Sequence, residues 1–300
     1  MVLKDVKCLF YADDAKFMLP IRSTHDCVTL QNAATRFVEL CKLFGFELVK
    51  CKTMTITKSR MQINYSYQLD DTILERVNKF NDLGIIYNDK FNFNDDFSTR
   101  IAKARSMLGF IKRQTADFKD ESVLKILYMS FVRSNLEYSS PVWSPYHIGW
   151  IRKFEKVQCR FMKFIIRNQP NDQRFNYLDM CIRMNLPPLL LRRKLASIMT
   201  CYDLLTNKID CPDLLENLNV NCPVRQLRNN ELFKLVHHSR DYAVHEPLNE
   251  MMANFNDVSH LFDFDMQEAL KRYKFKSEAM YILKSAIPDR ELGLYTSLGS

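Results

Sequence analysis

The chain has 300 residues and a formal net charge of +8, and 47% of its residues are hydrophobic, 12% of all residues being aromatic. This apolar content is enough for a core in one large domain or two ordinary ones, which excludes a disordered chain. The positive balance favours polyanionic partners. No apolar run approaches the roughly 18 residues that cross a bilayer, and Asp5 interrupts the first residues, so we expect neither a membrane span nor a secretory signal.

The nine cysteines are scattered, and none belongs to a Cys-x-x-Cys pair. This pattern predicts reduced, mostly buried thiols in an intracellular protein, nuclear or cytoplasmic, and no disulfide framework or zinc site. Six glycines in the whole sequence, widely spaced, exclude a glycine-rich phosphate loop.

Residues 1–20 predict a hairpin whose turn carries Asp13 and Asp14 between two apolar runs. Adjacent like charges oppose each other's ionisation. A divalent cation removes that opposition, and Mg²⁺ prefers carboxylate oxygens while leaving room for phosphates and water. On these letters alone, a solvated Asp-Asp turn remains the alternative.

The next elements complete a small α+β part. Apolar residues from Cys27 to Phe44 recur at three- and four-residue steps, which predicts a helix capped by Ser23 or Thr24 and ended by Gly45. Residues 53–57 and 63–67 alternate as strands, and residues 80–87 are extended with a bend or close approach at Gly84.

Long helical periods follow residue 94. The expected apolar faces lie at residues 101, 104, 108 and 111, at residues 123, 126, 127, 130 and 131, and at residues 151, 154, 157, 161 and 165. The predicted class is α+β. We expect an α+β part over residues 1–92, a basic helical region over 93–170, and a helical C-terminal region over 171–300 whose role from residue 260 onward is unassigned.

Two of these helices carry basic stripes. The first contains Arg100, Lys103, Arg105, Lys112 and Arg113, with no acid between residues 98 and 116. The second contains Arg152, Lys156, Arg160, Lys163 and Arg167 as a ridge opposite the apolar side, with Glu155 the only acid nearby. Such rows can follow a phosphate backbone. A solvated face with alkyl stems lying along the core is the alternative.

The motif at residues 11–14, Tyr-Ala-Asp-Asp, resembles the Y/F-A-D-D hairpin of reverse transcriptases from non-LTR retrotransposons of the LINE and jockey-like kind. The likeness continues in order to about residue 260. The segments that carry it are residues 26–31, 40–48, 50–54, 77–85, 103–113 and 136–145.

The resemblance implies a partial polymerase palm, a helical thumb and a C-terminal extension. It implies RNA-directed DNA polymerase chemistry, with two Mg²⁺ ions, an RNA template, a DNA primer and deoxynucleoside triphosphates. By resemblance, Asp13 and Asp14 would be the catalytic metal ligands and Lys50 or Lys52 would lie near the triphosphate. The Leu83-Gly84 bend would support the primer end, and the basic helices would hold the template–primer duplex.

Two departures from the family pattern bear on activity. The family takes a further metal-binding aspartate from an upstream palm strand, whereas this sequence begins ten residues before Tyr11. The segment of residues 47–52 is also two residues shorter than the family pattern. A shift by an even number keeps each strand side chain on the same face, but it does not fix where the lysine lies. We therefore expect a fragment that is inactive alone. The alternatives are a non-catalytic nucleic-acid-binding protein and a retrotransposon remnant without function.

Overall fold

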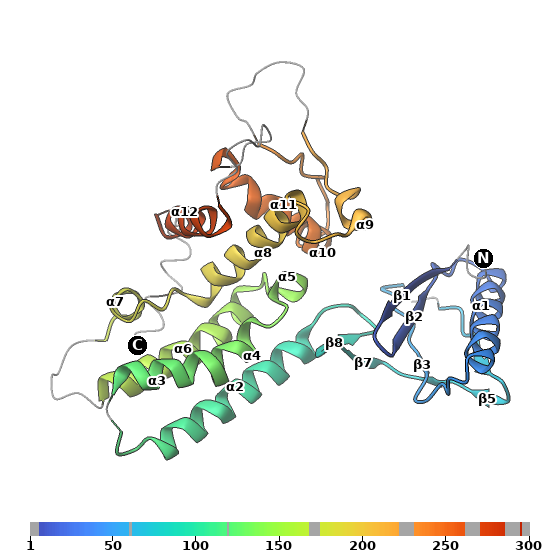
Figure 1. Ribbon diagram of the computed structural model, residues 1–300, viewed down its shortest axis with the longest axis horizontal. Helices are drawn as coiled ribbons and strands as arrows, with labels where there is room; N and C mark the ends of the chain where they lie inside the picture. The colour runs from blue at the N-terminus through green and yellow to red at the C-terminus, as the bar shows by residue number, and fades with distance from the viewer. Residues whose placement is uncertain are drawn as a thin grey trace. The chain divides into compact units, whose positions relative to one another are not determined.

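The computed structural model describes residues 6–59, 62–118, 120–167, 175–221, 231–261, 271–285 and 295, and Figure 1 shows its ribbon. It divides into two compact units, residues 1–96 and 97–300. The first combines one long helix with short strands, and the second is helical, so the α+β class holds at this level. Across the described ranges, no helix combines the length and the apolar character needed to cross a membrane.

The first unit begins with the predicted hairpin, made of β1 (Lys7–Tyr11) and β2 (Asp14–Met18) in antiparallel register. One face of this hairpin packs on α1 (Thr24–Leu43), because Phe37 of α1 contacts the rings of Phe10 and Phe17. Ser23 is the N-cap of α1, and the reciprocal bonds between Ser23 and Asp26 form a capping box. The predicted hairpin, helix and cap are confirmed.

The remaining strands of this unit are short. β3 (Lys52–Thr53) pairs in parallel with β6 (Glu75–Arg76), and β4 (Gln68–Leu69) pairs with β5 (Thr72–Ile73). The strands expected over 53–57 and 63–67 are therefore wrong beyond the two-residue β3. The Arg76 guanidinium donates hydrogen bonds to the Thr55 hydroxyl and the Tyr65 carbonyl, both at 2.6 Å, so a side chain links these two segments. The extended segment at 80–87 is a hairpin of β7 (Lys79–Asp82) and β8 (Ile85–Asn88).

The second unit consists of helices. In chain order they are α2 (Asn94–Gln114, whose first turn belongs to the first unit), α3 (Glu121–Leu127), the π-helix η1 (Tyr128–Arg133), α4 (Ser134–Glu137), α5 (Ser140–Trp143), α6 (Ile148–Arg167), α7 (Tyr177–Arg183), α8 (Leu189–Leu205), α9 (Pro212–Leu215), α10 (Asp241–Val244), α11 (Pro247–Asn256), the 3₁₀ turn η2 (Ser259–Leu261) and α12 (Arg272–Ser285). The predicted helices over α2 and α6 bury the expected apolar faces.

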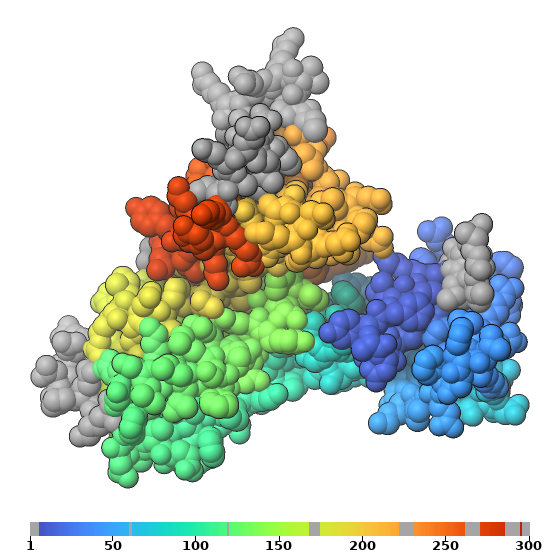
Figure 2. All heavy atoms as spheres, in the orientation of Figure 1, coloured from blue at the N-terminus to red at the C-terminus, as the bar shows by residue number. Residues whose placement is uncertain are grey.

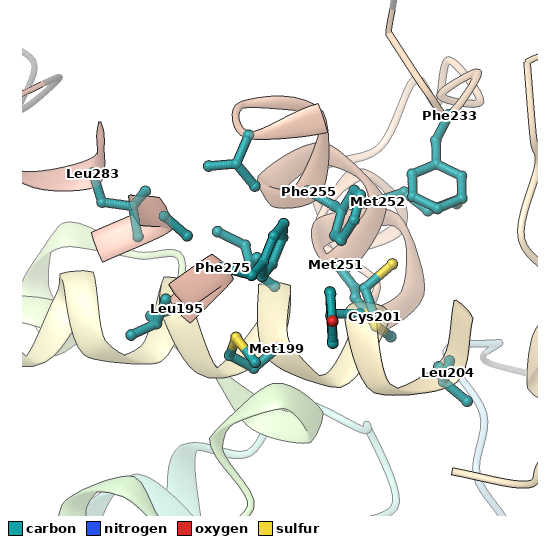
Figure 3. Close-up of a cluster of buried hydrophobic side chains, with 14 of the residues drawn as sticks. Leu195, Met199, Cys201, Leu204, Phe233, Met251, Met252, Phe255, Phe275 and Leu283 are labelled. Atoms are coloured by element: carbon teal, nitrogen blue, oxygen red, sulfur yellow. The ribbon is translucent and has the colours of Figure 1, made fainter. Parts of the chain in front are cut away.

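The core of this unit is organised around α8. This helix contacts α4, α5 and α6 as well as α11 and α12, so the two predicted regions over 93–170 and 171–300 pack together (Figure 1). Figure 3 shows the apolar cluster between α8, α11 and α12, which contains Leu195, Met199, Phe255, Phe275 and Leu283.

The face of the helix over 121–137 differs from the prediction. The buried residues are Leu124, Tyr128, Val132 and Leu136, whereas the expected core residues Ile126 and Phe131 are 56% and 50% exposed. The buried face is one residue out of step with the predicted one from α3 onward, and the π-helical turn, with its wider i→i+5 repeat, keeps residues four apart on that face as far as Leu136.

Candidate nucleic-acid interface

The first candidate surface, within the first unit, is the tip of the β1–β2 hairpin. Tyr11 pairs with Asp14, so Ala12 and Asp13 form a two-residue loop, with Ala12 at a φ of 50°. Asp13 and Asp14 are both exposed. Because strand side chains alternate, Asp14 lies on the face opposite Phe10 and α1, together with Lys16.

An ion pair connects this hairpin to the predicted primer-grip turn. The Lys16 ammonium, on the same face of β2 as Asp14, pairs with the carboxylate of Asp82 at the end of β7. Asp82 directly precedes the two-residue turn of Leu83 and Gly84, whose φ values of 47° and 80° are both left-handed. The structure therefore brings the Leu83-Gly84 turn to the same hairpin as Asp13 and Asp14. Lys16 was not among the residues that the sequence singled out, although its two-residue spacing from Asp14 was visible there.

The two lysines expected near a triphosphate lie in and before β3. Lys50 is exposed at a φ of 61°, and Lys52 forms an ion pair with Glu75 of the neighbouring strand at 3.1 Å. No contact ties either lysine to the carboxylates of Asp13 and Asp14 in the described part of the chain. Their predicted role stays a prediction.

The carboxylate pair fits part of a magnesium site. Exposed carboxylate oxygens suit Mg²⁺, which commonly binds one or two protein carboxylates and takes its other ligands from water and phosphate. In the described ranges, no three His, Cys, Asp or Glu side chains converge in a way that could hold a metal ion. The donor set therefore does not fit a two-metal centre, and we derive no nucleotidyl-transfer step from it.

A separate candidate surface, within the second unit, is the basic face of α6. All five predicted ridge residues are exposed, whereas Ile151, Phe154, Val157, Phe161 and Ile165 are buried on the other side. We call the exposed row the α6 ridge; it contains Arg152, Lys156, Arg160, Lys163 and Arg167.

Packing of α2 beside α6 joins the two predicted stripes. Lys112 of α2 donates a hydrogen bond from Nζ to the Arg160 carbonyl at 3.2 Å, and its ammonium lies 5.3 Å from the centre of the Phe164 ring. Burial lowers the pKa of Lys112, and the charges of Arg160 and Arg167 lower it further. Burial and the charge of Arg160 likewise lower the pKa of Arg105. These four side chains, Arg105, Lys112, Arg160 and Arg167, form what we call the basic cluster.

The basic cluster is a concentration of positive charge without a matching acid. Within the described part of the chain, no ion pair with a carboxylate involves any of its four members. Besides burial, which is the larger cause, repulsion among these cations lowers the pKa values of Arg105 and Lys112, and the binding of an anion relieves that repulsion. Lys103 and Arg113, also predicted, are exposed on the same α2 helix.

Arg100 lies apart from this surface, which corrects its predicted placement. The side chain is only 7% exposed. Its guanidinium lies 4.6 Å from the centre of the Trp143 ring, and Nη1 donates a hydrogen bond to the Tyr138 carbonyl at 3.2 Å. Position 100 lies three residues after the buried Phe97 and four before the buried Ala104, so the helix places it on the buried face.

Glu155, the only acid expected near the α6 ridge, points into the core instead. Its carboxylate accepts hydrogen bonds from the Tyr177 hydroxyl at 2.5 Å and from the backbone N–H groups of Leu189 and Leu190 at 3.2 and 2.7 Å. It thereby caps the N-terminus of α8 from another helix. The signal was present in the sequence, because Glu155 lies one helical turn from the buried Ile151. The ridge is consequently more uniformly positive than its sequence suggested.

Comparison with protein-family models, with curated proteins and with solved structures finds no match for this chain.

Proposed function

We propose that this chain is part of a non-LTR retrotransposon reverse transcriptase, and that its helical unit holds an RNA template–DNA primer duplex. The observation that supports the duplex-binding part most directly is the basic cluster. Helices α2 and α6 both contribute cations to this surface. Burial and mutual repulsion lower the pKa values of two of them, Arg105 and Lys112. The acid of α6, Glu155, is buried and does not neutralise them. A phosphate backbone is the polyanion that neutralises such a row.

The enzymatic part of the proposal depends on the likeness of residues 11–14 and of the ordered segments after them. The exposed Asp13-Asp14 pair and the nearby Leu83-Gly84 turn are compatible with it. Since the described residues offer two carboxylates and no third ligand beside them, we propose that this polypeptide alone does not extend a primer. Primer extension on a poly-A template with Mg²⁺ tests this, and synthesis that disappears in Asp13→Asn would overturn the inactivity.

Duplex binding is tested by fluorescence anisotropy with a labelled RNA–DNA duplex over a range of salt concentrations. The double variant Arg105→Gln/Arg160→Gln removes two charges from the basic cluster. We expect weaker binding and a salt slope that falls by about 2, because each lost phosphate contact removes about one unit.

The matched control is Lys90→Gln/Lys208→Gln, which removes the same net charge from two exposed positions outside the basic cluster. This control should bind the duplex with the salt slope of the parent chain. Equal weakening in both double variants would mean that net charge alone attracts the duplex, and it would contradict a specific surface. Binding that does not respond to salt would contradict the proposal altogether.

A further inference from the structure

We propose that the outward face of α12 is a stacking platform for the unpaired bases of a single-stranded nucleic acid. The inference rests on the proposed function, because it takes nucleic acid to be the partner of the helical unit. It adds a second surface with a different ligand, since the basic cluster suits the phosphates of a duplex.

The inward face of α12 fixes the helix to the core. Phe275 and Leu283 are buried in the cluster drawn in Figure 3, and the Phe275 ring stacks on that of Tyr202 with centres 4.5 Å apart. Arg272 donates two hydrogen bonds to the Asp203 carboxylate of α8, from Nε at 2.7 Å and from Nη2 at 2.6 Å. A bidentate pair of this kind adds geometric specificity. The outward side chains therefore stand on a rigid support.

The outward face combines two tyrosines with lysines. Tyr273 and Tyr281 are 72% and 73% exposed, far more than tyrosines that contribute to a core. At 100° per residue, Tyr273, Tyr281 and Lys284 lie within about 80° of one another, and the two rings are separated by about 12 Å along the axis. Lys274 and Lys276 are also exposed, and the only acid of the helix, Glu278, is half-buried. Figure 2 shows the atoms of α12, in red, uncovered on the face toward the viewer.

These side chains match the two recognisable parts of a single strand. Every base offers an aromatic face that can stack on tyrosine, and every linkage offers a phosphate to a lysine. In a duplex the bases are already stacked on one another, so no base face is available to the tyrosine rings. An acidic polypeptide would satisfy the lysines but leave both rings in water. The combination therefore favours unpaired nucleic acid.

The test compares three labelled ligands by anisotropy on the full chain: an oligothymidylate of about ten nucleotides, an abasic strand of the same length, and the RNA–DNA duplex. The variant Tyr273→Ala/Tyr281→Ala removes both rings from exposed helical positions where alanine is well tolerated. We expect it to weaken oligothymidylate binding at least about fivefold, with abasic and duplex binding unchanged. The matched variant Tyr273→Phe/Tyr281→Phe keeps the rings and should bind like the parent chain.

Two outcomes overturn the platform: oligothymidylate binding that survives the alanine changes, or an abasic strand that binds the parent chain as tightly as oligothymidylate. Tighter binding of poly-glutamate than of oligothymidylate would assign the face to acidic polypeptides and also overturn it. Failure of the proposed function is read separately. The duplex surface is rejected if the parent chain does not bind the duplex, or if Arg105→Gln/Arg160→Gln leaves duplex binding unchanged. If oligothymidylate binding still depends on the two tyrosines in that case, the platform is supported.

Discussion

At the scale of single residues, the β7–β8 turn stores backbone strain beside the carboxylate hairpin. Leu83 has a φ of 47°, a conformation that costs an ordinary L-residue about 1–2 kcal/mol, and the residue is 44% exposed. Asparagine followed by glycine is the preferred pair for such a turn. Leu83→Asn should therefore stabilise β7 and β8 by about 0.5–1 kcal/mol, measured as slower hydrogen exchange of their amides.

The control for this change is Leu83→Ala, which removes the same apolar group but keeps a side chain poorly suited to positive φ. It should not slow exchange as Leu83→Asn does. Faster exchange in Leu83→Asn would show that contacts of the leucine side chain outweigh the strain.

A second effect at residue scale concerns pH. Burial raises the pKa of Glu250 on α11 to about 7 from its ordinary 4.5, although the positive charges of Lys194 and Arg193 oppose the rise. The folded chain then binds more protons than the unfolded chain between these two values. The free energy of unfolding should accordingly fall as pH rises from about 4.5 to about 7, by roughly 3 kcal/mol in total from this group.

Urea unfolding of the parent chain and of Glu250→Gln at about pH 5 and about pH 8 measures this effect. The glutamine variant carries no ionisable group at this position, so the difference between the two proteins should grow in favour of the variant as pH rises. A difference that stays constant with pH would contradict the raised pKa.

At the scale of elements, Glu155 holds α6, α7 and α8 together. Glu155→Leu would leave the N–H groups of Leu189 and Leu190 without their acceptor. It would also remove the carboxylate whose charge acts most strongly on the buried Arg193, which is 1% exposed. Breaking a buried charge arrangement by removing one member typically costs about 3–5 kcal/mol. We expect this loss in urea unfolding, and a smaller one in Glu155→Gln, which keeps an acceptor oxygen. Equal stability of Glu155→Leu and the parent chain would refute the capping role.

How far the elements could be predicted depends on where their contacts lie. The helices α1, α2 and α6 followed from three- and four-residue spacing, because one regular face meets the core. The face over 121–137 was wrong because the apolar residues of that stretch fit more than one helical face, and the buried one steps by four from Leu124 to Leu136 through the π-turn. Alternating side chains cannot show whether a segment finds a neighbouring strand to pair with, and the segments 53–57 and 63–67 are linked through the side chain of Arg76 instead.

The candidate site shows the same division. Exposure of the α6 ridge follows from helix geometry. The Lys16–Asp82 pair and the approach of Lys112 to Arg160 join residues 66 and 48 positions apart, which spacing along one element cannot reveal.

At the scale of the whole molecule, the two units can be observed independently. The sequence has only two tryptophans, Trp143 and Trp150, and both pack on Phe97 in the second unit. Thermal unfolding followed by tryptophan fluorescence therefore reports residues 97–300, whereas far-ultraviolet circular dichroism reports both units. A ligand of the basic cluster should therefore raise the unfolding midpoint that is detected by tryptophan fluorescence.

An RNA–DNA duplex at about a hundred times its Kd should stabilise the helical unit by about 2.7 kcal/mol. For a unit of this size, that corresponds to a rise of roughly 5–10 °C in the fluorescence-detected midpoint. The same duplex concentration should produce a much smaller rise in Arg105→Gln/Arg160→Gln, because the variant binds the duplex more weakly and the concentration is then a smaller multiple of its Kd. An equal rise in the parent chain and this variant would mean that the duplex binds elsewhere, since binding to the basic cluster must couple to the stability of the helices that form it.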